Sequence, residues 1–240
     1  MKNIWTITKR ELGAYFVSPV AYAIIAAFLV FSNLLFMLYL NQREASLRGW
    51  AGTMIFLAIF IAPMITMRVL SEEKQTGTIE LLLTSPVRDW ELVVGKFLAA
   101  LGVWLVILAL TLAYVVILRI FGNPDMVPIV TSYLALVLFG AASISIGVLT
   151  SAFSPNQIIA VFTAFFIMLV LWIASFLGQL PLPGGSNNAL AGILAYMSIY
   201  DHTNDMVKGV LDSKDIIYYL SVTIGCLFLS TRAIEARRWS

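Results

Sequence analysis

The sequence predicts an all-α membrane protein, and three observations support this fold class: its composition, six apolar runs and an uneven distribution of Lys and Arg. Of the 240 residues, 60% are hydrophobic and only 12% are charged, whereas roughly a quarter of an ordinary soluble domain is charged. A water-soluble globule would expose much of this apolar surface, but a bilayer accepts it on every outward face. We therefore expect lipid to be the main solvent.

Six apolar runs are long enough, or nearly so, to cross a bilayer. At about 1.5 Å per residue, a helix of about 20 residues crosses the roughly 30 Å hydrocarbon layer. The last run is short, and Tyr218 and Tyr219 would anchor it at the interface. The first run exceeds a signal-peptide core, so we expect a retained anchor and a mature chain that starts near Met1. In one membrane domain over 1–240, the expected spans are 17–40, 51–70, 97–118, 127–153, 158–180 and 216–231.

The Lys and Arg residues predict the orientation of these spans. Ten of the fifteen lie on the side of the N-terminus when the connections are assigned to alternate sides. By the positive-inside tendency both termini are cytoplasmic, as an even number of spans requires. We expect a multi-pass protein of the cytoplasmic (inner) membrane, with Arg68 and Lys96 at span ends where their side chains can snorkel.

Two segments outside the spans are predicted to lie at the membrane surface. Residues 1–16 place apolar side chains on one arc of a helix and polar ones on another, which favours an amphipathic helix on the inner leaflet. Between the fifth and sixth spans, 181–215 forms an external segment, and its apolar stretch 189–200 is too short to cross, which favours a re-entrant or interfacial helix. Ser-Pro pairs at 18–19, 85–86 and 154–155 each precede an apolar helix, with Ser suited to the N-cap.

Motifs for catalysis, metal binding and nucleotide binding are absent from the sequence. It has no HExxH, no GxSxG and no carboxylate pair inside a span. Gly95-Lys96 lacks the upstream glycine of a phosphate loop, so we expect no cofactor bound by this chain. Cys226 is the single cysteine, expected to be a small buried apolar residue, and His202 is expected in a solvated loop. The net charge of +2 gives no basis for nucleic-acid binding.

The cytoplasmic connection 71–96 carries the most specific pattern. A glycine break at Gly77 precedes a short expected helix over 78–84, and a second break at the Ser-Pro pair leads into the third span. The elements in order are Glu73, Gly77-Thr78, Glu80, Leu81-Leu82, Ser85-Pro86 and Gly95-Lys96. This order resembles permease subunits of the ABC-2 family of ABC transporters, and the resemblance extends over essentially the whole chain. Within that family the chain looks closest to the permeases of gliding motility and of nitrous-oxide-reductase maturation.

The resemblance implies a function and partners that spacing alone does not give. Such a permease pairs with a second copy or a homologous permease above a cytoplasmic ABC ATPase dimer, which binds ATP and Mg²⁺, and an extracytoplasmic auxiliary protein can join. The short helix in 71–96 would be the coupling helix that enters the ATPase, and the first helix would lie beside it. The implied coupling residues are Glu73, Thr76, Gly77, Thr78, Glu80 and Thr84, with Lys9, Arg10 and Glu11 on the first helix.

Small and polar residues inside the spans suggest packing and gating positions. Small residues would let backbones approach closely, either between subunits or within one subunit; they are Gly95, Ala99, Gly102, Gly140, Ser143 and Gly147. Pro63 is expected to bend the second span. Asn33, Thr111 and Ser145 would line a cavity or simply bond a neighbouring backbone. Two other functions stay open: a non-transporting membrane scaffold that recruits partners, and a membrane-embedded enzyme.

Overall fold

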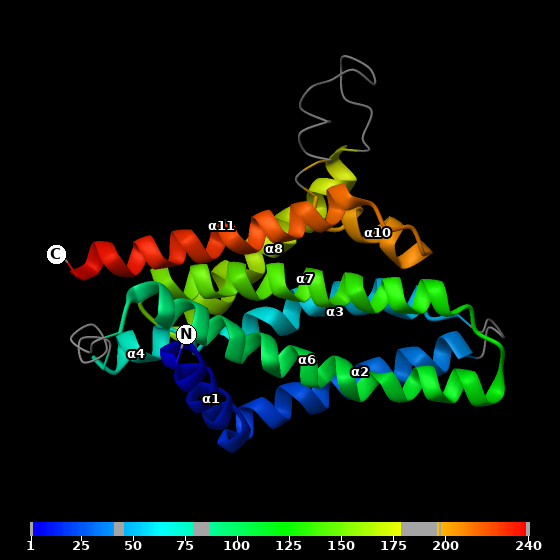
Figure 1. Cartoon of the computed structure of the whole chain (residues 1–240), viewed down its shortest axis with the longest axis horizontal. Coiled ribbons are helices and arrows are strands. Elements are labelled where there is room, and N and C mark those ends of the chain that lie inside the picture. The colour runs from blue at the N-terminus through cyan, green and yellow to red at the C-terminus, as the bar shows by residue number, and fades with distance from the viewer. Residues whose placement is uncertain (1, 41–45, 79–86, 179–195, 197, 239–240) are drawn as a thin grey trace, which may run out of the picture.

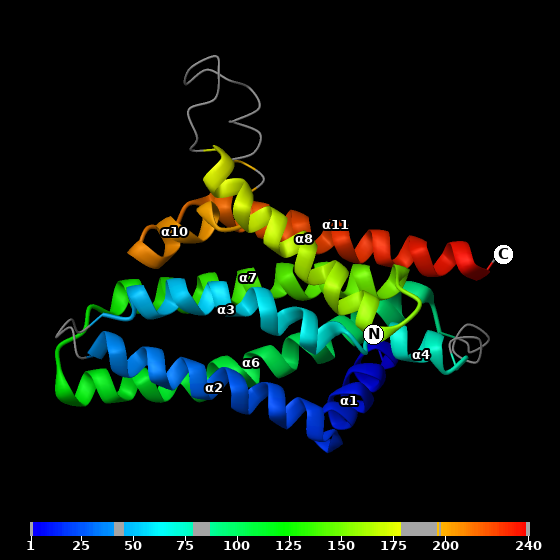
Figure 2. The same ribbon diagram turned by 180° about the vertical axis from the view of Figure 1, so that it is seen from behind.

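The computed structural model describes residues 2–40, 46–78, 87–178, 196 and 198–238, and every regular element in these ranges is a helix. Six helices are long and apolar enough to cross a membrane. This confirms the expected all-α, six-span fold. The long helices run side by side in one bundle (Figures 1 and 2). Their bounds are α2 Pro19–Leu40, α3 Arg48–Thr66, α6 Asp89–Phe121, α7 Met126–Phe153, α8 Gln157–Gly178 and α11 Ser213–Arg238.

Helix α7 is the centre of the bundle because it contacts the most neighbours. It packs against α3, α6, α8 and α11, and 72% of its most apolar stretch is buried, against 17% for α11. Buried indoles satisfy their N–H groups inside this core: Trp104 Nε1 donates to the carbonyl oxygen of Leu136 at 3.0 Å, and Trp50 Nε1 donates to Ser32 Oγ at 3.1 Å. The outer faces of α2 and α8 remain apolar and exposed, which suits helices bathed in lipid.

Three shorter helices cap the bundle at its two ends. Helix α1, Lys2–Val17, and helix α4, Ser71–Gln75, lie at the end that holds both termini, here called the terminal end (Figure 1). Helix α10, Asp201–Lys208, lies at the opposite end, here called the far end (Figure 2). Helix α1 packs along the start of α6 and buries Ile7 and Thr8, whereas the apolar side chain of Trp5 on the same helix is 69% exposed.

Two helices extend beyond the predicted spans because polar residues at their starts are satisfied. Helix α6 begins at Asp89 rather than at 97, and Glu91 Oε2 accepts a bond from the backbone N–H of Arg88 at its N-cap. Helix α11 runs from Ser213 to Arg238, well beyond 216–231. Tyr219 is fully buried and donates to the carbonyl oxygen of Ile199 at 2.6 Å, so its expected role as an interfacial anchor is wrong.

The Ser-Pro pairs do not all cap helices as predicted. Ser154 is the C-cap of α7, and the residue that caps α8 is Asn156, whose Oδ1 accepts from the N–H of Ile159 at 2.9 Å. Ser18 does precede α2 directly. The pair at 85–86, most of the expected helix over 78–84 and most of the apolar stretch 189–200 lie outside the described residues.

Candidate functional site

A buried lysine joins three helices at the terminal end. Lys96, on α6, is 2% exposed, and its Nζ lies 2.7 Å from Glu73 Oε1 on α4 and 3.3 Å from Glu11 Oε2 on α1. We call these three residues the Lys96 triad. The expectation that Lys96 would snorkel into solvent is therefore wrong, because two carboxylates supply the charge partners that the buried ammonium needs.

Close packing of α1 on α6 places Glu11 in the triad. Thr8 Oγ1 donates to the carbonyl oxygen of Gly95 at 3.1 Å. A Cβ built on Gly95 would lie 2.8 Å from Ile7 Cγ2, so only glycine allows this approach. Since residues three and four apart share a helix face, Glu11 follows Thr8 and Ile7 onto the side that covers Lys96.

Helix α4 is held in place by the end of α7. The backbone N–H groups of Leu70 and Ser71 both donate to Ser151 Oγ at 3.0 Å, and Lys74 Nζ donates to the carbonyl oxygen of Ala152. Glu73 then points from this fixed helix toward Lys96 and is only 16% exposed. Helix α4 is thus joined to α7 by hydrogen bonds and to α1 and α6 by the triad.

The charges at this junction balance when Arg10 is included with the Lys96 triad. Arg10 Nη2 lies 2.9 Å from Glu11 Oε1, so two cations face two carboxylates. Glu73 Oε2 is buried and has no hydrogen-bond partner among the described residues. A cluster of this kind resists separation, because removing both carboxylates leaves the Lys96 ammonium unpaired in a low-dielectric site.

The predicted coupling residues divide into a buried set and an exposed set. Glu11 and Glu73 face Lys96, a placement that the sequence did not predict. Lys9, Arg10, Thr76, Gly77 and Thr78 are exposed at the terminal end and form what we call the terminal rim. Gly77 has φ of +73°, a left-handed conformation that ends α4 and favours glycine. Glu80 and Thr84 lie outside the described residues.

The small residues predicted to mediate helix packing do so within this chain. Gly95 and Gly102 lie against Ile7 and Leu12 of α1, Gly140 against Trp104 of α6, and Gly147 against Thr66 of α3. Ala99 and Ser143 are fully buried. Of the two possibilities left open by the sequence, packing within one subunit accounts for these contacts.

None of the four residues predicted to line a cavity or form a gate lines the cavity found among the described residues. Thr111 Oγ1 donates to the carbonyl oxygen of Leu108 at 2.7 Å, and Ser145 Oγ to that of Ala142 at 2.7 Å. Asn33 is exposed on α2, and Pro63 is buried within α3. A cavity of about 390 Å³ between α1, α2 and α3 is lined by none of these four residues. Thr111 and Ser145 therefore act as backbone-bonded core residues, and the gating bend at Pro63 stays a prediction.

The prediction of a solvated His202 is wrong. His202 is 8% exposed in α10, its Nδ1 lies 2.7 Å from Asp215 Oδ1, and its ring stacks on Tyr218 with centroids 4.0 Å apart. This contact fixes α10 to the start of α11. Among the described residues, no three His, Cys, Asp or Glu side chains gather into a metal-binding group. Cys226 is a half-buried free thiol.

Sequence reasoning missed Lys96 and Ser151 as junction residues. A single sequence shows both only as polar positions, Lys96 in the early turns of α6 and Ser151 in the last turn of α7. The sequence feature that could have pointed to Lys96 is its position directly after Gly95, a small residue near the start of a long apolar helix where another helix can pack closely. These contacts do not test the alternative of a membrane-embedded enzyme.

Comparison with known proteins agrees with this architecture. A comparison with curated proteins gave no significant match. A family model described as "ABC-2 family transporter protein" matches residues 7–231. This range includes α4, five of the six candidate spans in full, and the sixth span as far as residue 231. The finer placement near gliding-motility and nitrous-oxide-reductase-maturation permeases stays a prediction. The matched region takes in nearly the whole chain, so this multi-pass membrane protein belongs to the ABC-2 transporter family.

Proposed function

We propose that this chain is the transmembrane subunit of an ATP-driven transporter, and that it moves substrate across the cytoplasmic membrane with energy from a separate ATPase subunit. ATP and Mg²⁺ would bind in that subunit, and two copies of the chain, or this chain and a homologue, would form the membrane pathway. Family membership supports a permease subunit. The observation that carries the finer proposal is the Lys96 triad.

The terminal rim is the surface that we propose to meet the ATPase. It combines the exposed cations Lys9 and Arg10 with the exposed turn after α4. Directly behind it, the triad joins α1 and α4 to α6. A push on the rim would therefore be transmitted to a long helix of 33 residues that crosses the whole bundle. Closure of the ATPase dimer would tilt the bundle between two states, as rigid elements do in domain rotations.

The proposed orientation places the terminal end in the cytoplasm, with both chain termini there. It rests on the excess of Lys and Arg at that end. Because Cys226 is the single cysteine, Cys226→Ala gives a background for labelling. In intact cells a membrane-impermeant maleimide should label Lys208→Cys and should label Lys9→Cys only after permeabilisation. The reverse pattern would overturn the orientation and the coupling proposal with it.

Copurification tests the function directly. The tagged chain, purified from membranes of its own host, should bring down a protein with a nucleotide-binding P-loop and vanadate-sensitive ATP hydrolysis. Reversing two rim charges with Lys9→Glu and Arg10→Glu should reduce the recovered ATPase at least about tenfold, since charge reversal at an interface costs several kcal/mol.

A matched control comes from the far end. Lys208 and Lys214 are 57% and 61% exposed, and each pairs with a nearby Asp, much as Arg10 pairs with Glu11. The changes Lys208→Glu and Lys214→Glu should leave ATPase recovery unchanged. A non-transporting scaffold would bring down other partners and no nucleotidase. An auxiliary protein at the far end would be lost in the control variant only.

A further inference from the structure

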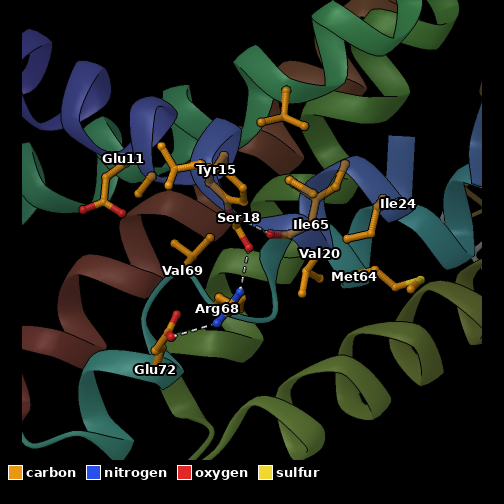
Figure 3. Close-up of a pocket in the computed structure, with 14 residues that line it drawn as sticks. Glu11, Tyr15, Ser18, Val20, Ile24, Met64, Ile65, Arg68, Val69 and Glu72 are labelled. Atoms are coloured by element: carbon orange, nitrogen blue, oxygen red, sulfur yellow. Dashed lines mark hydrogen bonds and ion pairs between the residues drawn. The ribbon is translucent and has the colours of Figure 1, made fainter. Parts of the chain in front are cut away.

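The cavity between α1, α2 and α3 has one polar side and one apolar side. Its volume of about 390 Å³ falls in the range of small-molecule sites, roughly 300–1,000 Å³. In Figure 3, Arg68 lies near Ser18 and Glu72, whereas Val20, Ile24 and Met64 lie on the other side. An occupant that fits both sides must be amphiphilic.

Arg68 offers an unused donor on the polar side. Its Nη1 donates to Ser18 Oγ and its Nη2 to Glu72 Oε1, both at 3.1 Å. Its Nε is buried, but the side chain is 35% exposed, and Nη1 and Nη2 each carry a second N–H that can meet an acceptor in the cavity. A phosphate oxygen is the type of acceptor that a guanidinium binds best.

The charges that line the cavity disfavour a simple anion. Arg68 is opposed by the carboxylate of Glu72, which is 40% exposed and can accept a further bond. Glu11 also lines the cavity, but its carboxylate is engaged by Lys96 and Arg10. A headgroup with a phosphate for Arg68 and an ammonium for Glu72 matches both charges. A choline headgroup matches less well, because a quaternary ammonium has no N–H to donate.

The position of the cavity along the spans matches the order of groups in a phospholipid. Ser18 directly precedes α2, and Arg68 follows the end of α3, so the polar side lies where both apolar helices end. Val20 and Met64, 39% and 40% exposed, continue from it along the outer surface of the same helices. We propose that this cavity binds an amine-bearing zwitterionic phospholipid of the phosphatidylethanolamine class, with its phosphate on Arg68, its ammonium on Glu72 and an acyl chain along Val20 and Met64. This site requires only that the chain spans a membrane and does not depend on transport.

Lipid competition on the full chain tests the site. Delipidated protein in detergent would receive dioleoyl phosphatidylethanolamine, phosphatidylcholine or phosphatidylglycerol at equal concentration, with bound lipid counted by native mass spectrometry. One charge-assisted hydrogen bond corresponds to roughly a tenfold preference for the ethanolamine lipid over the choline lipid. Equal binding of these two lipids, or strongest binding of the anionic lipid, would overturn the assignment. So would displacement of the lipid by equimolar soluble phosphoethanolamine or inorganic phosphate, which would identify a soluble ligand.

Two variants with matched controls separate the headgroup from the chain. Glu72→Gln keeps a hydrogen bond to Arg68 but replaces the carboxylate with a neutral acceptor, which holds an ammonium less tightly, so most of the preference for the ethanolamine lipid over the choline lipid should be lost. Glu235→Gln alters a carboxylate on α11 that is paired with Arg232 in the same way, and should change nothing.

Val20→Trp should fill the apolar side and lower binding of all three lipids. Val30→Trp, at a 58% exposed position of the same helix outside the cavity, should not. Thermal unfolding checks that each variant is folded, and if Val20→Trp is not, Glu72→Gln decides alone. An ethanolamine preference that is undiminished in Glu72→Gln would refute the proposal.

Discussion

The Lys96 triad leads to a quantitative prediction about the loss of its two carboxylates. With either Glu11→Gln or Glu73→Gln alone, the ammonium of Lys96 keeps one charge partner, and we expect a loss of about 1 kcal/mol in the free energy of unfolding. With both changes, a lysine that is 2% exposed has no charge partner, and the loss should reach about 3–5 kcal/mol. The double variant should therefore lose more than the sum of the two single variants.

A third substitution tests the cause of this excess loss. Adding Lys96→Met removes the stranded charge and keeps much of the side-chain volume. Since replacing a buried ion cluster with apolar groups is often neutral, the triple variant should regain at least about 2 kcal/mol over the double variant. A purely steric role of the two glutamates would give no such recovery.

Unfolding in mixed micelles with increasing SDS, followed by the fluorescence of the six tryptophans, measures these differences. The pair Lys214 and Asp212, 2.9 Å apart and exposed at 61% and 44%, provides the control. Asp212→Asn should cost less than about 0.5 kcal/mol because exposed pairs contribute little. Additive losses in the double glutamate variant, or no recovery with Lys96→Met, would refute the claim that Lys96 is a buried charge held by Glu11 and Glu73.

Three further predictions concern other positions. Gly140→Ala should lower the free energy of unfolding by about 1–3 kcal/mol, because its Cβ would lie 2.0 Å from Trp104 Nε1. As the control, Gly225→Ala would place a Cβ with nothing within 4 Å, and it should be neutral or slightly stabilising in the same SDS titration. His202→Ala should strand the buried carboxylate of Asp215 and speed amide hydrogen exchange in α10 at least about tenfold, a loss that Asp215→Asn added to it should partly reverse. Gly77 has φ of +73°, and the left-handed conformation costs an Ala about 1–2 kcal/mol, so Gly77→Ala should reduce coupled ATP hydrolysis only mildly. Gly77→Pro should abolish coupling, because Pro cannot adopt this conformation. Equal activity of the two variants would contradict the proposed role of this turn.

The spans could be predicted because lipid imposes a strong and local constraint. Each backbone polar group must be satisfied within its own helix, so an apolar run of sufficient length indicates a span without knowledge of its neighbours. The predicted bounds are less accurate where tertiary contacts satisfy a charged residue. Asp215 lies before the last apolar run, yet α11 includes it because His202 supplies its partner from α10. The sequence shows the charge but not the residue that accommodates it.

The candidate site could be located by pattern but not assembled from it. The order of residues in 71–96 identified the region, and the glycine break at Gly77 corresponds to the left-handed turn that ends α4. The triad was not predicted, because Glu11, Glu73 and Lys96 lie far apart in the sequence. Periodicity tells which face of a helix is apolar and does not tell which helices meet. For the same reason, Glu73 was expected to face a partner, although its side chain faces Lys96.

Both ends of the bundle attach a short helix to a long one through a buried polar contact. At the far end, His202 of α10 contacts Asp215 of α11; at the terminal end, Glu73 of α4 contacts Lys96 of α6. A short helix held by apolar contacts alone can slide, because such contacts have no fixed direction. Separating a buried charge pair costs about 3–5 kcal/mol, so a load on α4 moves α6 more readily than it breaks the junction. If ATPase closure acts on α4, this stiffness transmits its displacement into the bundle. A double variant of Glu11 and Glu73 should then uncouple hydrolysis from transport while the ATPase remains bound to the terminal rim.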